Sequence, residues 1–215
     1  DFGRRRSRIE SQIRQVAEKL GAQPVIDPDL LDEVTALNEW PVALAGRFEE
    51  RFLAVPAEAL ISTMKENQKY FHLLDTNGKM LPAFITVANI ESRDPSQVIK
   101  GNERVVRPRL TDAAFFFETD RKQSLESRLP ALRTIVFQNE LGSVHDRVTR
   151  IAHLSGRIAE ATQAPVDACR RAGLLCKADL VTSMVLEFPD LQGIMGRYYA
   201  LESGESVAVA NAIEE

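Results

Sequence analysis

The sequence has few side chains suited to redox or metal chemistry. Cys169 and Cys176 are its only cysteines, and it contains three histidines. If both cysteines lie on one helix, their spacing of seven positions separates them by about 10 Å, which is beyond disulfide reach. The pair also lacks the further ligands that a structural zinc site needs. These features exclude a disulfide scaffold and a zinc finger, and isolated thiols favour a reducing cytoplasm.

Long apolar runs and an excess of positive charge are also missing. The 215 residues are 44% hydrophobic and 27% charged, which suits a folded chain rather than a disordered or membrane-spanning one. The net charge of −4 excludes an overall basic field that would attract nucleic acid. Any contact with RNA must therefore come from local patches. One such patch is a run of arginines near residue 1, and another extends from Lys100 to Arg109.

The sequence contains no loop motif for binding nucleotide phosphates. Neither GxxxxGKS/T nor GxGxxG is present, and the glycines are scattered. Nothing in the sequence brings His72, His145 or His153 to a nucleophile, and His72 falls within an expected strand. We therefore expect no complete catalytic site and no metal site in this chain.

Helical patterns dominate the first part of the chain. Apolar residues recur at helical spacing over residues 4–20. Asp27 is placed to cap a second helix, and Pro56 opens a third. A fourth helix is expected over residues 95–120, with an interruption near Pro108, because proline cannot donate the hydrogen bond of a helix interior.

A β-hairpin is the clearest strand signal. Aromatic and β-branched runs at residues 70–74 and 83–87 flank a polar turn in which Asn77 and Gly78 suit positive φ angles. A short apolar run at residues 42–45 predicts one more strand. These signals describe a mixed α/β module.

Strand signals fade after about residue 124. Residues 144–159 then carry a strict helical stripe of apolar and small side chains. The sequence therefore predicts an α+β fold with two domains. Residues 1–125 form a mixed α/β module with an antiparallel hairpin, and residues 126–215 form an all-helical part.

Two segments of the helical part resemble the opening of an HD domain. They are residues 145–152 (HDRVTRIA) and 170–180 (RRAGLLCKADL). Phosphohydrolases of that family use histidine and aspartate ligands to hold two metal ions that activate water. His145 falls where the first ligand would lie, but Cys176 and Lys177 replace the His-Asp pair. The resemblance implies an HD-like helical scaffold without its metal site, and a metal-dependent phosphohydrolase remains the alternative function.

A longer series of motifs covers nearly the whole chain in order. It comprises residues 30–35 (LLDEVT), 39–41 (EWP), 52–58 (FLAVPAE), 63–65 (TMK), 68–71 (QKYF), 87–92 (VANIES), 101–110 (GNERVVRPRL), 112–113 (DA), 115–117 (FFF), 177–182 (KADLVT), 187–188 (EF) and 191–200 (LQGIMGRYYA). In these motifs the chain resembles the β subunit of the bacterial two-subunit glycyl-tRNA synthetase. The sequence also starts without methionine and ends within a helical pattern, so we expect it to be an internal piece of that subunit, with the helical domain truncated.

The resemblance implies a non-catalytic part of a glycine–tRNA ligase. In that family the α subunit carries the catalytic core, so ATP and Mg²⁺ are expected there and no cofactor is expected in this chain. The partners implied are the α subunit and tRNA(Gly), with no membrane, in the cytoplasm. The fragment alone should be inactive in aminoacylation.

The candidate tRNA contacts are basic residues near the centre of the mixed module. An acidic protein that binds tRNA needs local positive charge, because lysine and arginine make most backbone contacts. We predict such a patch, with the proline at residue 108 breaking the helix and presenting the arginines on either side of it from a turn. Alternatively, these side chains pair with acidic neighbours and serve the fold. The patch consists of Lys65, Lys69, Arg104, Arg107 and Arg109.

Overall fold

The N-terminal part of the chain is built on a four-stranded antiparallel sheet with the strand order β1-β3-β4-β2. A computed structural model describes residues 1–215 and divides them into two units, Asp1–Ala114 and Phe115–Glu215. The elements of the first unit are α1 (Phe2–Lys19), β1 (Gln23–Pro24), α2 (Pro28–Leu37), β2 (Val42–Arg47), η1 (Glu50–Ala54), α3 (Ala57–Gln68), β3 (Phe71–Leu74), β4 (Met80–Ala88) and most of α4 (Pro95–Asp120).

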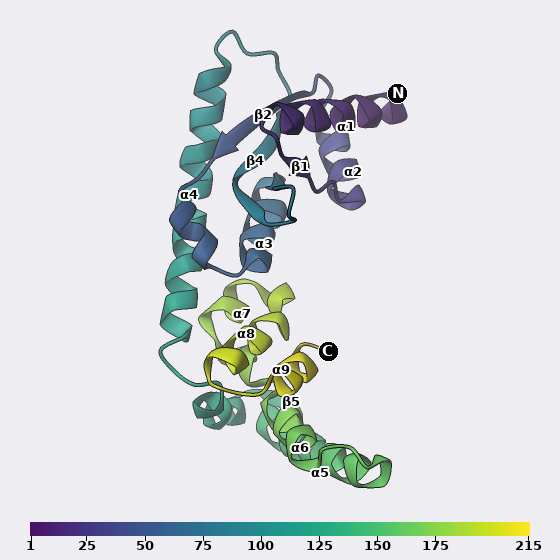
Figure 1. Cartoon of the computed structure of the whole chain (residues 1–215), viewed down its shortest axis with the longest axis vertical. Coiled ribbons are helices and arrows are strands. Elements are labelled where there is room, and N and C mark those ends of the chain that lie inside the picture. Colours follow the sequence, from purple (N-terminus) through teal and green to yellow (C-terminus); the bar gives the residue numbers. More distant parts are fainter. The chain divides into compact units, whose positions relative to one another are not determined.

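Helices α1 and α2 pack with the sheet to form the core of this unit (Figure 1). Ile9, Ile13 and Ala17 recur every four residues along α1, so they share one face of the helix, and all three are buried. They join apolar side chains of α2 and of the strands, including Leu31 and Ile85. Burial of this stripe explains why an arginine-rich segment folds as a helix.

Strand β2 is an edge strand whose free hydrogen-bonding groups are partly occupied by side chains. The Gln12 amide accepts from the backbone N–H of Ala43 at 2.9 Å and donates to the carbonyl of Pro41 at 3.0 Å. At the other end of the strand, the N–H of Arg47 donates to Glu103 of α4 at 2.9 Å. Both outward-facing ends of β2 are thus satisfied without another strand.

Phe84 packs on the opposite face of the sheet. Its neighbour Ile85 points into the core with α1 and α2, so Phe84 points to the other face. Its ring stacks on Tyr70 with centroids 4.4 Å apart, and it covers Gly46 on the paired strand. The Tyr70 hydroxyl is 2.6 Å from Asn102 Oδ1, which ties α4 to the sheet.

The hairpin and the second helix form as the sequence predicts. β3 and β4 pair antiparallel, and the turn between them contains Gly78 with φ of +78°. The Asp75 carboxylate accepts from two backbone N–H groups of this turn. The Asp27 carboxylate accepts from the N–H groups of Asp29 and Leu30 at the start of α2, which confirms the predicted cap.

The predicted interruption at Pro108 is wrong. α4 runs without a break from Pro95 to Asp120 with Pro108 inside it. The ring removes the hydrogen bond to the carbonyl four residues earlier, but Val106 and Leu110 are fully buried on either side and hold the helix to its unit. Burial on both sides therefore outweighs the one missing hydrogen bond.

The second unit consists mainly of short helices. They are η2 (Glu126–Thr134), α5 (Val144–Thr162), α6 (Val166–Leu175), η3 (Ala178–Val181), α7 (Ser183–Glu187), η4 (Pro189–Leu191), α8 (Ile194–Glu202) and α9 (Val207–Glu214). The α+β fold class is therefore confirmed. One exception to an all-helical part is a small hairpin of β5 (Val136–Gln138) and β6 (Gly142–Ser143). All three residues of β5 are exposed, so no alternating pattern marks the strand in the sequence.

Two buried aspartates connect the helices of this unit. Asp120 is 2% exposed and accepts from the N–H groups of Ser183 and Met184 at 3.0 and 2.9 Å. It also accepts from the Tyr199 hydroxyl at 3.1 Å and pairs with Arg128. Asp120 therefore organises the start of α7.

The second aspartate, Asp179, is fully buried and caps α8. Its Oδ2 atom accepts from the N–H groups of Gly193 and Gly196 at 2.6 and 3.2 Å, and its Oδ1 atom has no partner. Burial raises the pKa of this carboxyl.

The last turns of α4 belong to the helical unit. Phe117 stacks on Tyr199 with ring centroids 6.0 Å apart, and Asp120 makes the bonds described above. The two units therefore divide within α4 rather than at residues 125–126, where the sequence placed the boundary.

Candidate functional site

The two candidate lysines lie at the end of α3, and both are engaged with α2. Lys65 Nζ is 2.7 Å from Asp27 Oδ2, and Lys69 Nζ is 2.9 Å from Glu33 Oε2. The hydrogen bond between Lys65 and Asp27 lowers the pKa of the carboxyl and raises that of the ammonium. Because Asp27 also caps α2, this pair links the capped end of α2 to α3.

The three candidate arginines lie on α4, and all are exposed. Arg107 Nε is 2.6 Å from Glu49 Oε1, so this guanidinium is also engaged with an acidic neighbour. Arg104 and Arg109 have no carboxylate within ion-pair distance. They are therefore the two members of the predicted patch whose charge is unpaired within the chain.

Continuous helical geometry places the arginines on different sides of α4. Arg107 and Arg109 are two positions apart, which rotates them by roughly 200° around the helix axis. They are not presented together from a turn, as the sequence had indicated. Arg104 and Arg107 are three positions apart and share a face.

Lys100 extends the face of Arg104 and Arg107 and was missed as a site residue. The three side chains follow the spacing i, i+4, i+7, and Lys100 is exposed. We call Lys100, Arg104 and Arg107 the α4 basic stripe. The spacing is visible in the sequence, but it indicates one surface only if the helix continues through residue 108.

The HD-like segment of the second unit carries a thiol and a cation where two metal ligands would be expected. His145 lies in the first turn of α5, and Cys176 is the C-cap of α6, followed by Lys177. Burial raises the pKa of the Cys176 thiol, and the nearby positive charges of Lys177 and Arg147 oppose this effect. Nowhere in the chain do three or more His, Cys, Asp or Glu side chains gather to hold a metal ion.

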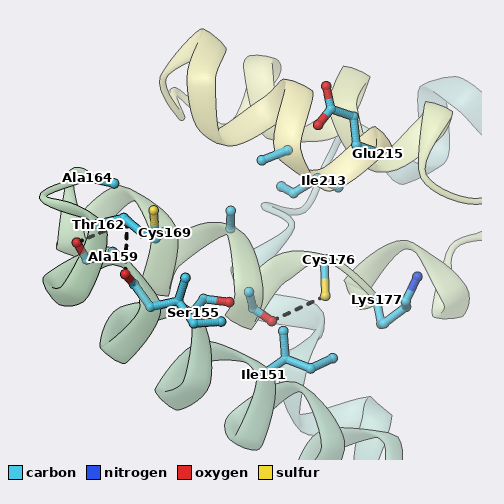
Figure 2. A pocket seen from close by; sticks show the side chains of 14 residues that line it. Ile151, Ser155, Ala159, Thr162, Ala164, Cys169, Cys176, Lys177, Ile213 and Glu215 are labelled. Carbon is cyan, nitrogen blue, oxygen red and sulfur yellow. Dashed lines mark hydrogen bonds between the residues drawn. The ribbon is translucent and has the colours of Figure 1, made fainter.

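An apolar groove lies beside the HD-like segment, between α5, α6 and α9 (Figure 2). Its volume is about 560 Å³, and both free cysteines line it. The other lining residues include Ile151, Ser155, Ile158, Ala172, Lys177, Ile213 and Glu215. With Lys177 and Glu215 as its only charged side chains, the groove suits apolar groups.

Comparison with known proteins gives a match over the whole chain. The family model described as "Glycyl-tRNA synthetase beta subunit" matches residues 1–215. Proteins named "Glycine--tRNA ligase beta subunit" from Marinobacter nauticus, Chromohalobacter salexigens and Hahella chejuensis are 62%, 61% and 58% identical. Each match covers 100% of this chain and 31% of the relative. These findings confirm the resemblance seen in the sequence motifs, and they lend no support to the HD-type phosphohydrolase. The chain belongs to the glycyl-tRNA synthetase beta subunit family.

Proposed function

We propose that this chain is a non-catalytic part of the β subunit of a cytoplasmic glycine–tRNA ligase. It supports the binding of tRNA(Gly) and association with the α subunit, where ATP and Mg²⁺ bind and glycine is activated. The observation that carries the proposal is the family match over all 215 residues. No helix in the chain combines the length and the hydropathy needed to cross a membrane.

The proposed RNA contacts are Lys65, Lys69, Arg104, Arg107 and Arg109, together with Lys100, and Arg109 lies on a different side of α4 from the α4 basic stripe. Exposed cations bind the phosphate backbone by releasing counterions, which makes the affinity depend on salt. Arg104, Arg109 and Lys100 are available for such contacts at once, because none has an acidic partner. The other three must first exchange a carboxylate for a phosphate.

The test measures tRNA affinity against salt concentration with the assembled α and β subunits. Arg104→Ala and Arg109→Ala should each weaken binding and reduce the salt slope by roughly one unit for every phosphate that the variant no longer neutralises. Arg133→Ala is the control, because Arg133 is exposed and unpaired but belongs to the other unit. Unchanged affinity and slope in both variants would contradict the RNA contact, whereas glycine activation should be unaffected in all three.

A second pair of variants separates the two possible roles of Arg107. Glu49→Gln removes the negative charge beside the guanidinium, so it should tighten tRNA binding if Arg107 contacts phosphate, and Arg107→Ala should weaken it. If the ion pair serves only the fold, both variants should lower thermal stability slightly and leave the affinity unchanged. An exposed pair of this kind contributes about 0.2–1 kcal/mol to folding.

A further inference from the structure

The apolar groove is bordered by a helix face that the chain itself leaves open. Ile151, Leu154 and Ile158 follow the spacing i, i+3, i+7 along α5, which is the pattern of a contact face between helices. Leu154 is 58% exposed and Ile158 is 53% exposed. This face differs from the core face of α5, where Val148 and Gly156 are buried.

The open face also differs from the solvent face of the same helix. Arg150, His153 and Arg157 are exposed polar residues at the same helical spacing, on the side away from the core. α5 therefore has a core face, a polar face and a third, aliphatic face. Only the third combines large apolar side chains with exposure.

We propose that, in the full-length subunit, the polypeptide continuing from Glu215 packs into this groove and covers Ile158. Two observations favour that occupant. The relatives are much longer than this chain, which spans 31% of their length. Glu215 itself lines the groove, so residues that follow it start at the rim.

The size of the groove also favours a tethered segment over a separate protein. A groove of about 560 Å³ accommodates a few side chains, and a few side chains alone form a smaller contact than a stable complex between two proteins requires. A segment of the same chain needs less contact area, because tethering gives it an effective concentration in the millimolar range. Lys177 lines the groove and has no carboxylate within ion-pair distance, so the segment should combine apolar side chains with a carboxylate.

Photo-crosslinking in the full-length subunit, assembled with its α subunit, identifies the occupant. The probe is p-benzoylphenylalanine placed at position 158. The control carries the same probe at position 186, because Leu186 is 72% exposed and lies outside the groove. Mass spectrometry should find position 158 joined to a peptide after residue 215 of the same chain, and position 186 should give no such product.

Three other results would overturn the proposal: crosslinks to the α subunit, crosslinks to a second copy of this chain, or no crosslink beyond residue 215. A stability measurement provides an independent check. Ile158→Asp should lower the Tm of the full-length subunit by at least about 5 °C, and Leu186→Asp should leave it unchanged. Equal Tm values for the two variants would also count against the proposal. Neither test uses glycine or tRNA, so failure here leaves the proposed function untouched.

Discussion

The two units bury different kinds of polar group. In the sheet-containing unit the buried polar residues are neutral: Thr35, Asn38, Thr63 and Thr86. In the helical unit two carboxylates, Asp120 and Asp179, are buried together with Thr182. The difference follows from the backbone. Strands satisfy one another's N–H groups, whereas every helix leaves its first N–H groups without an intrahelical partner.

The need for acceptors outside the helix is greatest in short helices. α7 has five residues and α8 has nine, so a large share of their N–H groups lies in the first turn. Asp120 and Asp179 accept from those groups with carboxylates that are themselves buried. The comparison suggests that the helical unit depends on single charged side chains, and the sheet-containing unit on packing shared among many residues.

The strongest test of this comparison is Asp120→Ala. It removes an acceptor for three donors and leaves the Arg128 guanidinium buried without its carboxylate. Loss of one partner of a buried charged network costs about 3–5 kcal/mol. Urea denaturation should show this loss, and Asp112→Ala on the exposed side of the same helix should stay within about 0.5 kcal/mol of the parent. A small effect of Asp120→Ala would show that the carboxylate is dispensable.

Asparagine substitutions should have different stability costs at the two buried aspartates. Both oxygens of Asp120 accept hydrogen bonds from backbone N–H groups. In Asp120→Asn one oxygen is replaced by an NH₂ group, which cannot accept from the N–H that faces it. This substitution should lower the free energy of unfolding by about 2–3 kcal/mol. Asp179 uses only Oδ2, so Asp179→Asn can keep its carbonyl on Gly193 and should cost less than about 1 kcal/mol. Similar costs measured by denaturation would remove the distinction.

The pH dependence of Asp179→Asn tests the same carboxyl in another way. The pKa of Asp179 is raised by burial, so between its ordinary value and the raised value the folded state binds more protons than the unfolded state. The stability of the parent chain should therefore rise, relative to Asp179→Asn, as the pH is lowered toward about 4. A pH-independent difference between the two proteins would contradict burial of an ionisable group.

In the sheet-containing unit, the comparison predicts sensitivity to volume rather than to charge. A Cβ atom at Gly46 would clash with the Phe84 ring, and that ring is already stacked on Tyr70. Gly46→Ala should cost about 1–3 kcal/mol through overpacking. Gly101→Ala is the matched control, because nothing lies within 4 Å of its Cβ position, and helix propensity predicts a slight gain. Equal thermal stability of the two variants would show that the ring moves aside freely.

A small effect is expected at a half-buried carboxylate of the sheet-containing unit. Asp27→Ala removes the cap of α2 and should cost about 1 kcal/mol at neutral pH. The pKa of Asp27 is lowered, chiefly by the hydrogen bond from Lys65, so its contribution is present above about pH 4 and is lost as the pH falls through the lowered value. The difference from the parent chain should therefore shrink in acid. Asp29→Ala, which removes no capping bond, serves as the control.

Local signals in the sequence predicted much of the fold. The cap at Asp27 and the turn at Gly78 depend on interactions within a few residues, so the local sequence is enough to predict them. The path of α4 through Pro108 depends on burial of Val106 and Leu110 in tertiary contacts, which no local rule contains. The roles of Asp120 and Asp179 were missed for the same reason, because their partners lie far away along the chain.

The candidate RNA contacts were predictable only as a set of cations. Ion pairing of Lys65, Lys69 and Arg107 depends on elements that are distant in sequence, and the alignment of Lys100 with Arg104 depends on the unbroken helix. The tRNA contact therefore stays a prediction, now divided between paired and unpaired side chains.

The amide of Gln12 has a consequence for solubility. An uncovered edge strand can pair with an edge strand of another molecule and start aggregation. Gln12 occupies the carbonyl of Pro41 and the N–H of Ala43, and Glu103 occupies the N–H of Arg47, so groups at both ends of the free edge of β2 are already bonded. Two side chains from flanking helices should thus hinder pairing at the β2 edge of the sheet, with no need for a further strand.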